Sequence, residues 1–321
     1  MSKYEFQGVL KEKFDVNLTE NTVSVILAGG LGNIMFQAAT VLSYCKDKGL
    51  DPLLGYWTSH QTESSRWSKR LNRFARNHHL EPWGGHPMRE KAISMDDIYP
   101  NLPWFNSRPN AFAWWFYQDT AYDWDTGKGG VYYDLDEVVQ TPFLMQGYFF
   151  NYKYWHHNRD YLLEMFTLDK DFESWLHYHY SRYFDTDTIS LHLRMGSDHD
   201  FMQPDMVPSE WVEKKLNQLM EEDTRVLVFS DNLKRAEKMI DRYDLPKWRF
   251  IYIDEDAYVC MELMSRCNKH ILSNSTLSFW GAYLDKVENN PHTYIHKSFL
   301  NNHPKEMIPY KNWKIEDYED N

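Results

Sequence analysis

A single arginine stands where a predicted buried strand gives way to a loop. Residues 189–193 form an apolar run typical of such a strand, Arg194 follows it, and His192 is the strand's last residue but one. A guanidinium beside a buried strand is costly unless it meets an anion, and its planar fork suits a diphosphate. An internal ion pair with Asp198 or another acid explains the same spacing equally well. The spacing therefore indicates either an anion site or a structural ion pair.

Small polar residues follow two other predicted strands, 226–229 and 270–272. Four of them lead from the second strand into a predicted helix: Ser273, Asn274, Ser275 and Thr276. Hydroxyl and amide groups at a helix N-terminus bind phosphate well, although ordinary N-capping explains one or two of them. Asp231, after the first strand, is by itself typical of a helix cap. Together with Arg194, these helix starts predict a binding region for a diphosphate.

A glycine-rich turn follows the first predicted strand, at residues 23–27. Glycines let the backbone approach a ligand closely, and the amides that open the next helix can receive an anion. We therefore assign Gly30, Gly32 and Asn33 to the same candidate site, although the turn also fits a purely structural role. It does not match a dinucleotide fingerprint, because Met35 occupies the position of the third glycine.

These residues require a sheet whose strands all end at one edge. Strand and helix patterns alternate clearly at both ends of the chain, whereas residues 59–150 show poor periodicity except for an apolar strand at 143–145. From residue 188 onward, the predicted strands are 189–193, 226–229, 250–253 and 270–272, and the predicted helices are 209–220, 233–243, 259–266 and 277–287. This order predicts a parallel, doubly wound α/β sheet, and ligands of such sheets bind beyond the carboxyl ends of the strands.

Composition narrows the class of protein. The 321 residues carry 35 Lys and Arg against 47 Asp and Glu, a net charge of −12, which disfavours nucleic acid as a partner. An aromatic share of 17% indicates a large folded core and leaves rings that can stack on sugars. No apolar stretch is typical of a signal peptide or a membrane span, and the three cysteines fit neither a zinc module nor a disulfide framework. We expect a cytoplasmic protein with reduced thiols and no metal site.

Several segments, in order and spread over nearly the whole chain, resemble motifs of the alpha-1,2-fucosyltransferases. They are residues 29–38 (GGLGNIMFQA), 146–149 (QGYF), 229–232 (FSDN), 264–282 (MSRCNKHILSNSTLSFWGA) and 308–313 (IPYKNW). Residues 192–198 (HLRMGSD) stand where that family has a His-x-Arg-Arg-x-Asp motif. Their single Arg and Gly-Ser-Asp ending look more like the motif of the protein O-fucosyltransferases.

The resemblance implies a GT-B type fold, in which two Rossmann-like domains enclose a cleft. It implies an inverting enzyme that moves L-fucose from GDP-fucose to a sugar hydroxyl of a glycan without an essential metal. Carried over residue by residue, Arg194 and Asp198 are the expected catalytic residues. The expected donor-binding residues are Gly30, Gly32, Asn33, His192, Arg194, Asp231, Asn274, Ser275 and Thr276. We expect an acceptor-side domain at 20–165, a nucleotide-sugar-binding domain at 185–300 and a C-terminal segment at 301–321.

Three positions depart from the family pattern. Ile34 replaces a Gln, Met195 replaces the second Arg, and Cys260 stands where an Asp that reads guanine is expected. A thiol cannot accept guanine's two donors, and leaving them unpaired costs about 1 to 3 kcal/mol. Either the donor carries another base or a nearby acid substitutes, the candidates being Asp254, Asp256 and Glu262.

Two other functions are compatible with the residues. A catalytically silent homologue could bind glycans through its aromatic surfaces, with a donor site that has drifted at Met195 and Cys260. Sugar transfer onto nucleic acid is disfavoured by the charge but would reveal itself by strongly salt-dependent DNA binding. Acceptor recognition is expected in the irregular middle of the chain, where the Trp- and Tyr-rich residues 104–154 are the predicted acceptor wall.

Overall fold

The computed structural model describes residues 21–26, 30–55, 101, 104–105, 132, 143–145, 147–195 and 207–317. Its described part contains two separate sheets, and every strand pairing in both is parallel. The predicted α/β class with parallel sheets is therefore confirmed. The cleft and the domain boundaries stay predictions.

The N-terminal sheet has the strand order β3-β2-β1-β4. Its strands are β1 (Thr22–Ile26), β2 (Asp51–Gly55), β3 (Trp104–Phe105) and β4 (Phe143–Met145). The predicted first strand and the strand at 143–145 are thus present. Helix α2 (Leu31–Lys48) connects β1 to β2. It is followed by its C-cap residue Gly49, whose φ of 66° is a left-handed conformation that glycine adopts without strain.

The C-terminal sheet has the strand order β10-β9-β8-β5-β6-β7. Its strands are β5 (Thr188–Leu193), β6 (Arg225–Ser230), β7 (Phe250–Ile253), β8 (Lys269–Leu272), β9 (Thr293–His296) and β10 (Lys314–Glu316). The helices between them are α8 (Ser209–Leu219), α9 (Leu233–Ile240), α10 (Ala257–Met264), α11 (Thr276–Tyr283) and α12 (Phe299–Asn302). The four predicted strands form the centre and one side of this sheet, and β9 and β10 extend it.

A helical connection joins the two sheets. It comprises the short 3-10 turns η4 (Tyr152–Tyr154) and η5 (His156–Asn158), then α6 (Arg159–Met165), α7 (Lys170–Tyr180) and η6 (Ser181–Tyr183). Two further 3-10 turns, η9 (Lys247–Arg249) and η10 (Lys305–Met307), lie in the C-terminal part. Asp169 caps α7 by accepting hydrogen bonds from two first-turn amides. The buried side of α7 consists of Phe172, Trp175 and Leu176, a helical spacing.

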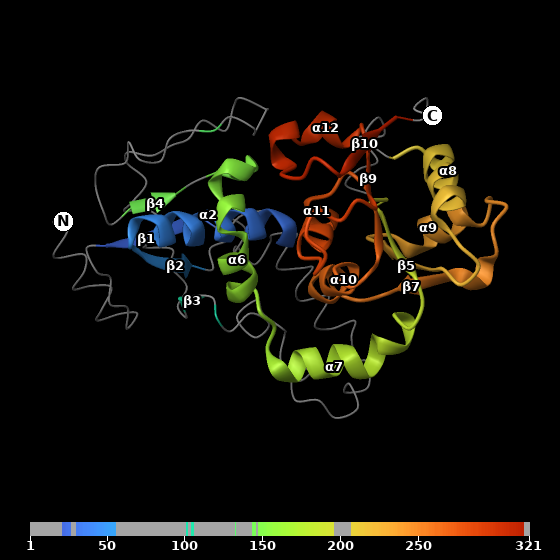
Figure 1. Ribbon diagram of the computed structural model, residues 1–321, viewed down its shortest axis with the longest axis horizontal. Coiled ribbons are helices and arrows are strands. Elements are labelled where there is room, and N and C mark those ends of the chain that lie inside the picture. The colour runs from blue at the N-terminus through green and yellow to red at the C-terminus, as the bar shows by residue number, and fades with distance from the viewer. Residues whose placement is uncertain are drawn as a thin grey trace, which may run out of the picture.

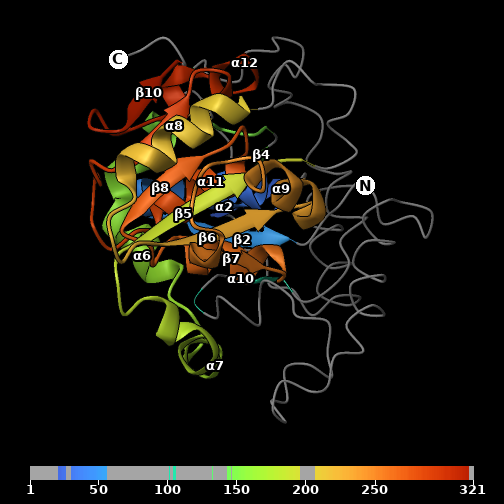
Figure 2. The same cartoon turned by 90° about the vertical axis from the view of Figure 1, so that its right-hand side faces the viewer.

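Helices cover both faces of the C-terminal sheet. Helices α8 and α9 lie on one face, where residues such as Trp211 and Ile240 pack on the strands in a core of their own. Helices α10 and α11 lie on the other face, next to α2 of the N-terminal unit (Figures 1 and 2). The side chains of α2, α10 and α11 form one continuous hydrophobic core. The two units are therefore joined by a shared core as well as by the chain.

Aromatic rings fill the core between the two units. Phe36 of α2 lies 5.1 Å from the Phe279 ring, 5.0 Å from the Trp280 ring and 5.4 Å from the Trp155 ring, measured between centroids. All four side chains are fully buried. The pairs of Phe36 with Trp155 and Trp280 are edge-to-face, an arrangement that stabilises a core beyond the area buried. Much of the high aromatic content therefore serves packing between the units.

Two predicted helices end more than two residues earlier than expected: the helix predicted at 233–243 ends at Ile240, and the last predicted helix ends four residues early. The sequence pattern placed a helix at 277–287, whereas α11 ends at Tyr283. The reason is local: the carboxylate of Asp285 accepts a hydrogen bond of 2.8 Å from the Val287 amide and so stabilises a turn. Val287 is 58% exposed, as a residue outside the helix can be.

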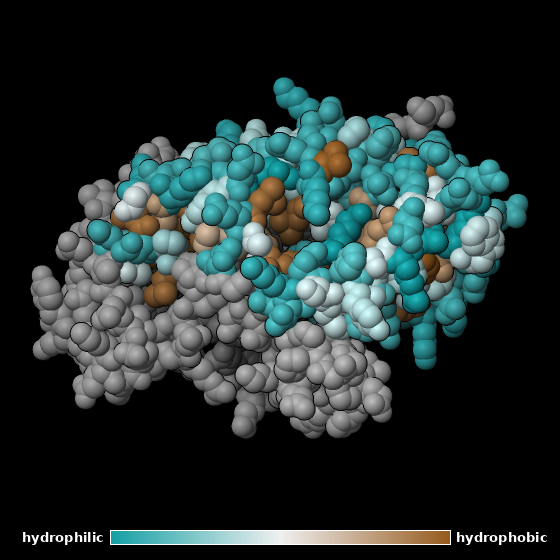
Figure 3. Space-filling model, turned by 60° about the horizontal axis from the view of Figure 1, so that its bottom comes forward, coloured by the Kyte–Doolittle hydropathy of each residue, from teal (hydrophilic) through white to brown (hydrophobic). Residues whose placement is uncertain are grey.

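The described surface is largely hydrophilic, with a hydrophobic hollow near the middle of one face (Figure 3). Within the part of the chain that the structure describes, no helix is long and apolar enough to cross a membrane. Cys45, Cys260 and Cys267 are buried and form no disulfide. Burial raises the pKa of the Cys45 thiol to about 12, so it is protonated at neutral pH.

Candidate active site

Arg194 lies at the carboxyl edge of the C-terminal sheet, where β5 is flanked by β6 and β8. Its Nη1 is 3.0 Å from Oδ2 of Asp231, which directly follows β6. The other carboxylate oxygen of Asp231 accepts a 2.7 Å hydrogen bond from the Met195 amide. The side chain of Arg194 remains 29% exposed. The internal ion pair considered from the sequence therefore exists with Asp231, and it holds the guanidinium at the edge of the sheet.

His192 lies directly beneath this edge and is buried. Its Nδ1 is 2.5 Å from the Ser273 hydroxyl, which follows the neighbouring strand β8. Burial, together with the positive charge of Arg194, lowers the pKa of His192 to about 3. The imidazole is therefore neutral at physiological pH and adds no second positive charge to the edge.

The polar residues after β8 form the start of α11. Ser275 is the N-cap, and its hydroxyl accepts a hydrogen bond from the Leu277 amide. The Ser278 hydroxyl donates to the carbonyls of Ser273 and Ser275 at 3.4 and 2.9 Å. Asn274 is only 6% exposed. The capping role considered from the sequence thus applies to Ser275, and these side-chain hydrogen bonds hold the first turn of α11 at the end of β8.

The glycine-rich turn lies directly against this helix start, although the two are far apart in sequence. The Thr276 hydroxyl donates a 2.8 Å hydrogen bond to Oδ1 of Asn33. A Cβ at Gly32 would lie 2.4 Å from the carbonyl carbon of Thr276, so only glycine fits. Gly30 is the N-cap residue of α2, and its carbonyl accepts hydrogen bonds from the Asn33 and Ile34 amides. The N-termini of α2 and α11 therefore meet.

This meeting of helix starts brings the partial positive charges of two helix N-termini together in an acidic protein. A helix N-terminus carries a partial positive charge and unpaired amides. Neither α2 nor α11 has an acidic residue in its first turn to neutralise that charge. Arg194, which adjoins the Ser273 region through β5 and β8, adds a guanidinium whose charge is partly balanced by the Asp231 carboxylate. The arrangement is chemically suited to an anion such as a diphosphate.

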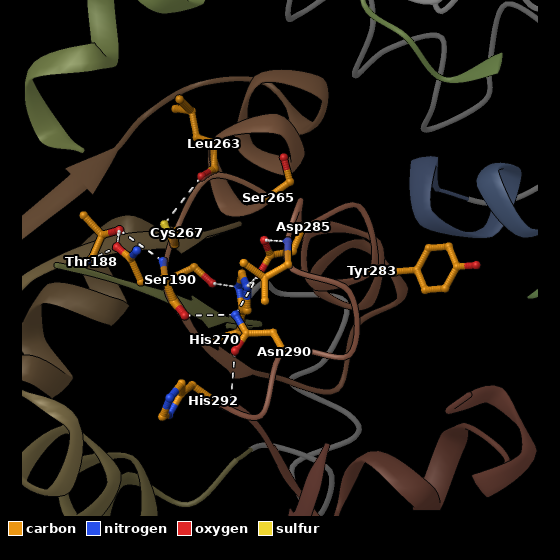
Figure 4. A network of polar contacts seen from close by, with 12 residues as sticks. Thr188, Ser190, Leu263, Ser265, Cys267, His270, Tyr283, Asp285, Asn290 and His292 are labelled. Carbon is orange, nitrogen blue, oxygen red and sulfur yellow. Dashed lines mark hydrogen bonds and ion pairs between the residues drawn. The ribbon is translucent and has the colours of Figure 1, made fainter. Parts of the chain in front are cut away.

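A buried polar network braces the strands that carry these residues (Figure 4). The hydroxyl of Ser190 on β5 is 2.9 Å from Nδ1 of His270 on β8, and Nε2 of His270 is 3.0 Å from the Asp285 carboxylate. Asn290 donates a 2.7 Å hydrogen bond to the same carboxylate. Ser190, His270 and Asp285 are the residue types of a hydrolase catalytic triad. Each is at most 4% exposed, so no substrate reaches the Ser190 hydroxyl. The network is structural.

The acids that could replace Cys260 in reading a base have different surroundings. Asp256 caps α10 by accepting hydrogen bonds from two first-turn amides, and Glu262 is buried within that helix. Asp254, directly after β7, is exposed. The Cys260 thiol donates to the Glu255 carbonyl, and burial raises its pKa well above the usual value, so it is neutral. Asp254 is thus the sterically accessible member of the three candidates.

Two arginines that hold elements of the site in place were not singled out from the sequence. Arg235 of α9 donates a 3.0 Å hydrogen bond to the Met195 carbonyl and so holds the residue after Arg194. Arg159 of α6 donates to the carbonyls of Tyr283 and Asp285, at the C-terminal end of α11. Both stand in ordinary helical patterns, so no local sequence signal marks them. Asp198, predicted as catalytic, lies outside the described residues.

No group of three or more His, Cys, Asp or Glu side chains that could hold a metal ion occurs among the residues that the structure describes. The expectation of an enzyme without an essential metal stays a prediction.

Comparison with known proteins places the chain in a family. A sequence model of Glycosyl transferase family 11 matches residues 123–319, more than half of the chain. The chain belongs to Glycosyl transferase family 11. This membership confirms the family resemblance that the sequence motifs indicated. The matched region of the family 11 chain contains Arg194, Asp231 and the α11 start, whereas the glycine-rich turn lies before it.

Individual relatives of this family 11 chain are distant. It is 27% identical over 188 residues to the O-antigen biosynthesis glycosyltransferase WbnK of Escherichia coli, a match that covers 54% of this chain and 61% of WbnK, less than two thirds of that protein. Among solved structures, fucosyltransferase NodZ from Bradyrhizobium is similar with 12% identity and a TM-score of 0.45, over 83% of this chain and 94% of NodZ. A glycosyl transferase of family 9 from Veillonella parvula is similar with 12% identity and a TM-score of 0.45, over 94% of this chain and 87% of its own.

Proposed function

We propose that this protein is an inverting glycosyltransferase that moves L-fucose from GDP-fucose to a sugar hydroxyl of a glycan. Membership of family 11 supports glycosyl transfer, and the motifs shared with the alpha-1,2-fucosyltransferases support fucose as the sugar. The observation that carries the proposal is the partly exposed guanidinium of Arg194 at the edge of the sheet. At this edge the N-termini of α2 and α11 meet, and neither helix has an acidic residue in its first turn.

In this proposal, Arg194 and the first-turn amides of α11 stabilise the departing nucleoside diphosphate. Negative charge grows on the leaving group while the sugar passes through an oxocarbenium-like state, so fixed positive groups lower the barrier. The ion pair with Asp231 keeps the guanidinium oriented before the donor arrives. The imidazole of His192 is neutral, so it adds no positive charge beside Arg194, and Arg194 is the cationic side chain that contacts the diphosphate in this proposal. The acceptor hydroxyl approaches over the start of α2, at residues 30–33.

Replacing Arg194 with Ala tests this role. We expect kcat for transfer from GDP-fucose to fall by a factor of about 100 to 1,000, as when one preorganised charge donor is removed from an active site. Arg242→Ala, which removes an exposed arginine just after α9, is the matched control and keeps wild-type activity. Circular dichroism checks that both variants are folded. Activity of Arg194→Ala within a few-fold of wild type refutes the assignment.

The nucleotide is tested separately by thermal shift. An enzyme that binds a nucleotide-sugar donor is stabilised by the matching nucleoside diphosphate, and the stabilisation grows with the ratio of ligand concentration to Kd. We expect GDP to raise Tm, and UDP, TDP and CDP to raise it less. A larger rise in Tm with another nucleotide would mean that the donor sugar is carried by that nucleotide and not by GDP. No rise in Tm with any of the four would favour a catalytically silent homologue.

A further inference from the structure

The hydrogen bond between Asn33 and Thr276 joins the first turns of two helices that belong to different units. Asn33 is in the first turn of α2, which packs on the N-terminal sheet, and Thr276 is the first residue of α11, which packs on the C-terminal sheet. The Thr276 hydroxyl is the donor and Oδ1 of Asn33 is the acceptor, 2.8 Å apart.

This bond limits what the Thr276 side chain can do for an anion. A hydroxyl has one hydrogen to donate, and phosphate oxygens at neutral pH accept hydrogen bonds from it. Because the hydrogen of Thr276 is directed to Asn33, the hydroxyl is not available to a phosphate while the bond is intact. What this residue can offer is its backbone amide, which, as the first of the helix, has no intrahelical acceptor.

The orientation of that amide depends on the other unit. Within its own unit, the first turn of α11 is shaped by the Ser275 cap and the Ser278 hydroxyl. Its position against α2 is set in two ways. The backbone of α11 lies so close to Gly32 that a Cβ there would not fit, and the Asn33 side chain accepts the Thr276 hydrogen bond. At the opposite end, Arg159 of α6 donates to the Tyr283 and Asp285 carbonyls. Residues of α2 and α6, outside the C-terminal unit, thus hold both ends of α11.

We propose that Asn33 is a positioning residue: through Thr276 it fixes the first turn of α11, so that the helix start meets the leaving diphosphate in the correct orientation. This inference rests on the proposed function. It assigns Asn33 a different role from that of a direct donor ligand. The two roles differ in one respect, which is whether Asn33 needs Thr276 in order to act.

A double-mutant cycle separates the two roles. The variants are Asn33→Ala, Thr276→Val and the double variant, with Thr276→Ser as the variant that keeps the hydroxyl. Steady-state transfer gives kcat and KM for GDP-fucose. If Asn33 acts through Thr276, each single change lowers kcat by a similar factor, on the order of tenfold to a hundredfold for a misplaced group, and the double variant is no worse than the worse single variant. Thr276→Ser recovers most of the kcat that Thr276→Val loses.

Three outcomes overturn the inference. If the two losses multiply in the double variant, or if Asn33→Ala mainly raises KM while Thr276→Val does not, Asn33 binds the donor directly. If the variants lose Tm but keep wild-type kcat, the bond is only structural. Asn217→Ala, on the exposed side of α8, is the control that keeps wild-type kcat and Tm. Wild-type protein that transfers no sugar refutes the proposed function itself, whereas an active wild type with an unimpaired Asn33→Ala variant refutes only the role of Asn33.

Discussion

Gly32 lies directly against Thr276, at the point where the first turns of α2 and α11 meet. A Cβ added to Gly32 would come within 2.4 Å of the Thr276 carbonyl carbon and 2.5 Å of the Leu277 nitrogen. Both are backbone atoms, so no side-chain rotation can relieve the contact. The two units can be this close only because residue 32 has no side chain.

Replacing Gly32 with Ala should therefore push the two helix starts apart. Overpacking a tight contact costs about 1 to 3 kcal/mol, so we expect a loss of that size in the free energy of unfolding, measured with urea. The stabilisation by GDP in a thermal shift should fall as well, because the candidate site lies at this contact.

Gly49→Ala is the control for this prediction, because it lies at the opposite end of the same helix. A Cβ at Gly49 has open space around it, but its φ of 66° strains any other residue by about 1 kcal/mol. This variant should lose stability while keeping the GDP shift. A Gly32→Ala variant with wild-type stability and a wild-type GDP shift would show that the helix starts separate easily.

Arg159 should contribute strongly to stability although it lies outside the candidate site. Its guanidinium is buried and donates to the carbonyls of Tyr283 and Asp285, which otherwise lie at an unsatisfied helix end. Arg159→Met removes both hydrogen bonds and the favourable charge at the helix C-terminus, so we expect a loss of about 1 to 3 kcal/mol in urea unfolding.

Arg182→Met provides the comparison, since Arg182 is an exposed arginine whose guanidinium contacts the neighbouring Tyr183 hydroxyl. Surface changes of this kind stay within about 0.5 kcal/mol of wild type. Equal losses for the two variants would mean that Arg159 does not fasten α11.

The three cysteines should be unreactive in the folded protein. Cys45, Cys260 and Cys267 are buried, and burial raises the pKa of each thiol, so the reactive thiolate is scarce at neutral pH. We expect a thiol reagent such as DTNB to react with none of them under native conditions and with all of them in concentrated urea. Rapid labelling of a folded sample would show that the core around α2 or α10 opens readily.

The sequence predicted elements well where a strand is apolar and bounded by polar turns. The strand at 250–253 matches β7 residue for residue, and the strand at 189–193 differs from β5 only by its first residue. Strand β10 was missed because it is only three residues long, Lys314 to Glu316, and has no apolar pattern. It is held by tertiary contacts: the Lys314 ammonium lies over the Tyr294 ring and donates to its hydroxyl.

The sequence predicts which residues of the site lie at the strand ends, but it does not predict which of their side chains contact one another. Strand order places Arg194, Asp231 and Ser273 at one edge, because parallel strands share the direction of their carboxyl ends. The partner of Arg194 was open between Asp198 and another acid, since the register of β5 against β6 decides it. The contact between Asn33 and Thr276 spans 243 positions and depends on how the two units pack, which no local pattern encodes.

The predicted acceptor wall divides in a similar way. Within its described part, Phe149, Phe150 and Tyr154 are buried and belong to the hydrophobic core, whereas Tyr148 and Tyr152 are half-buried. Most of residues 104–154 lie outside the described residues, so the wall as a whole stays a prediction. Aromatic composition alone cannot separate rings that fill a core from rings that face a ligand, because both require the same residue types.

The buried imidazole of His192 should make the protein less stable in acid. Its pKa is lowered to about 3 in the folded state, against about 6.5 in an unfolded chain. Between these values the unfolded state binds a proton that the folded state does not, so the free energy of unfolding decreases as pH falls through this window. The slope from this residue alone is about 1.4 kcal/mol per pH unit.

His192→Gln removes this proton uptake, and its effect must be followed by urea unfolding at several pH values. At about pH 7 the variant should be less stable than wild type, because it disturbs the contact with the Ser273 hydroxyl. The difference should shrink steadily toward about pH 4, because wild type alone carries the cost of keeping the imidazole neutral. His177→Gln, on the exposed side of α7, should run parallel to wild type throughout. A His192→Gln variant that also runs parallel to wild type would mean that the imidazole is protonated within the fold and is not shielded from water at the edge of the sheet.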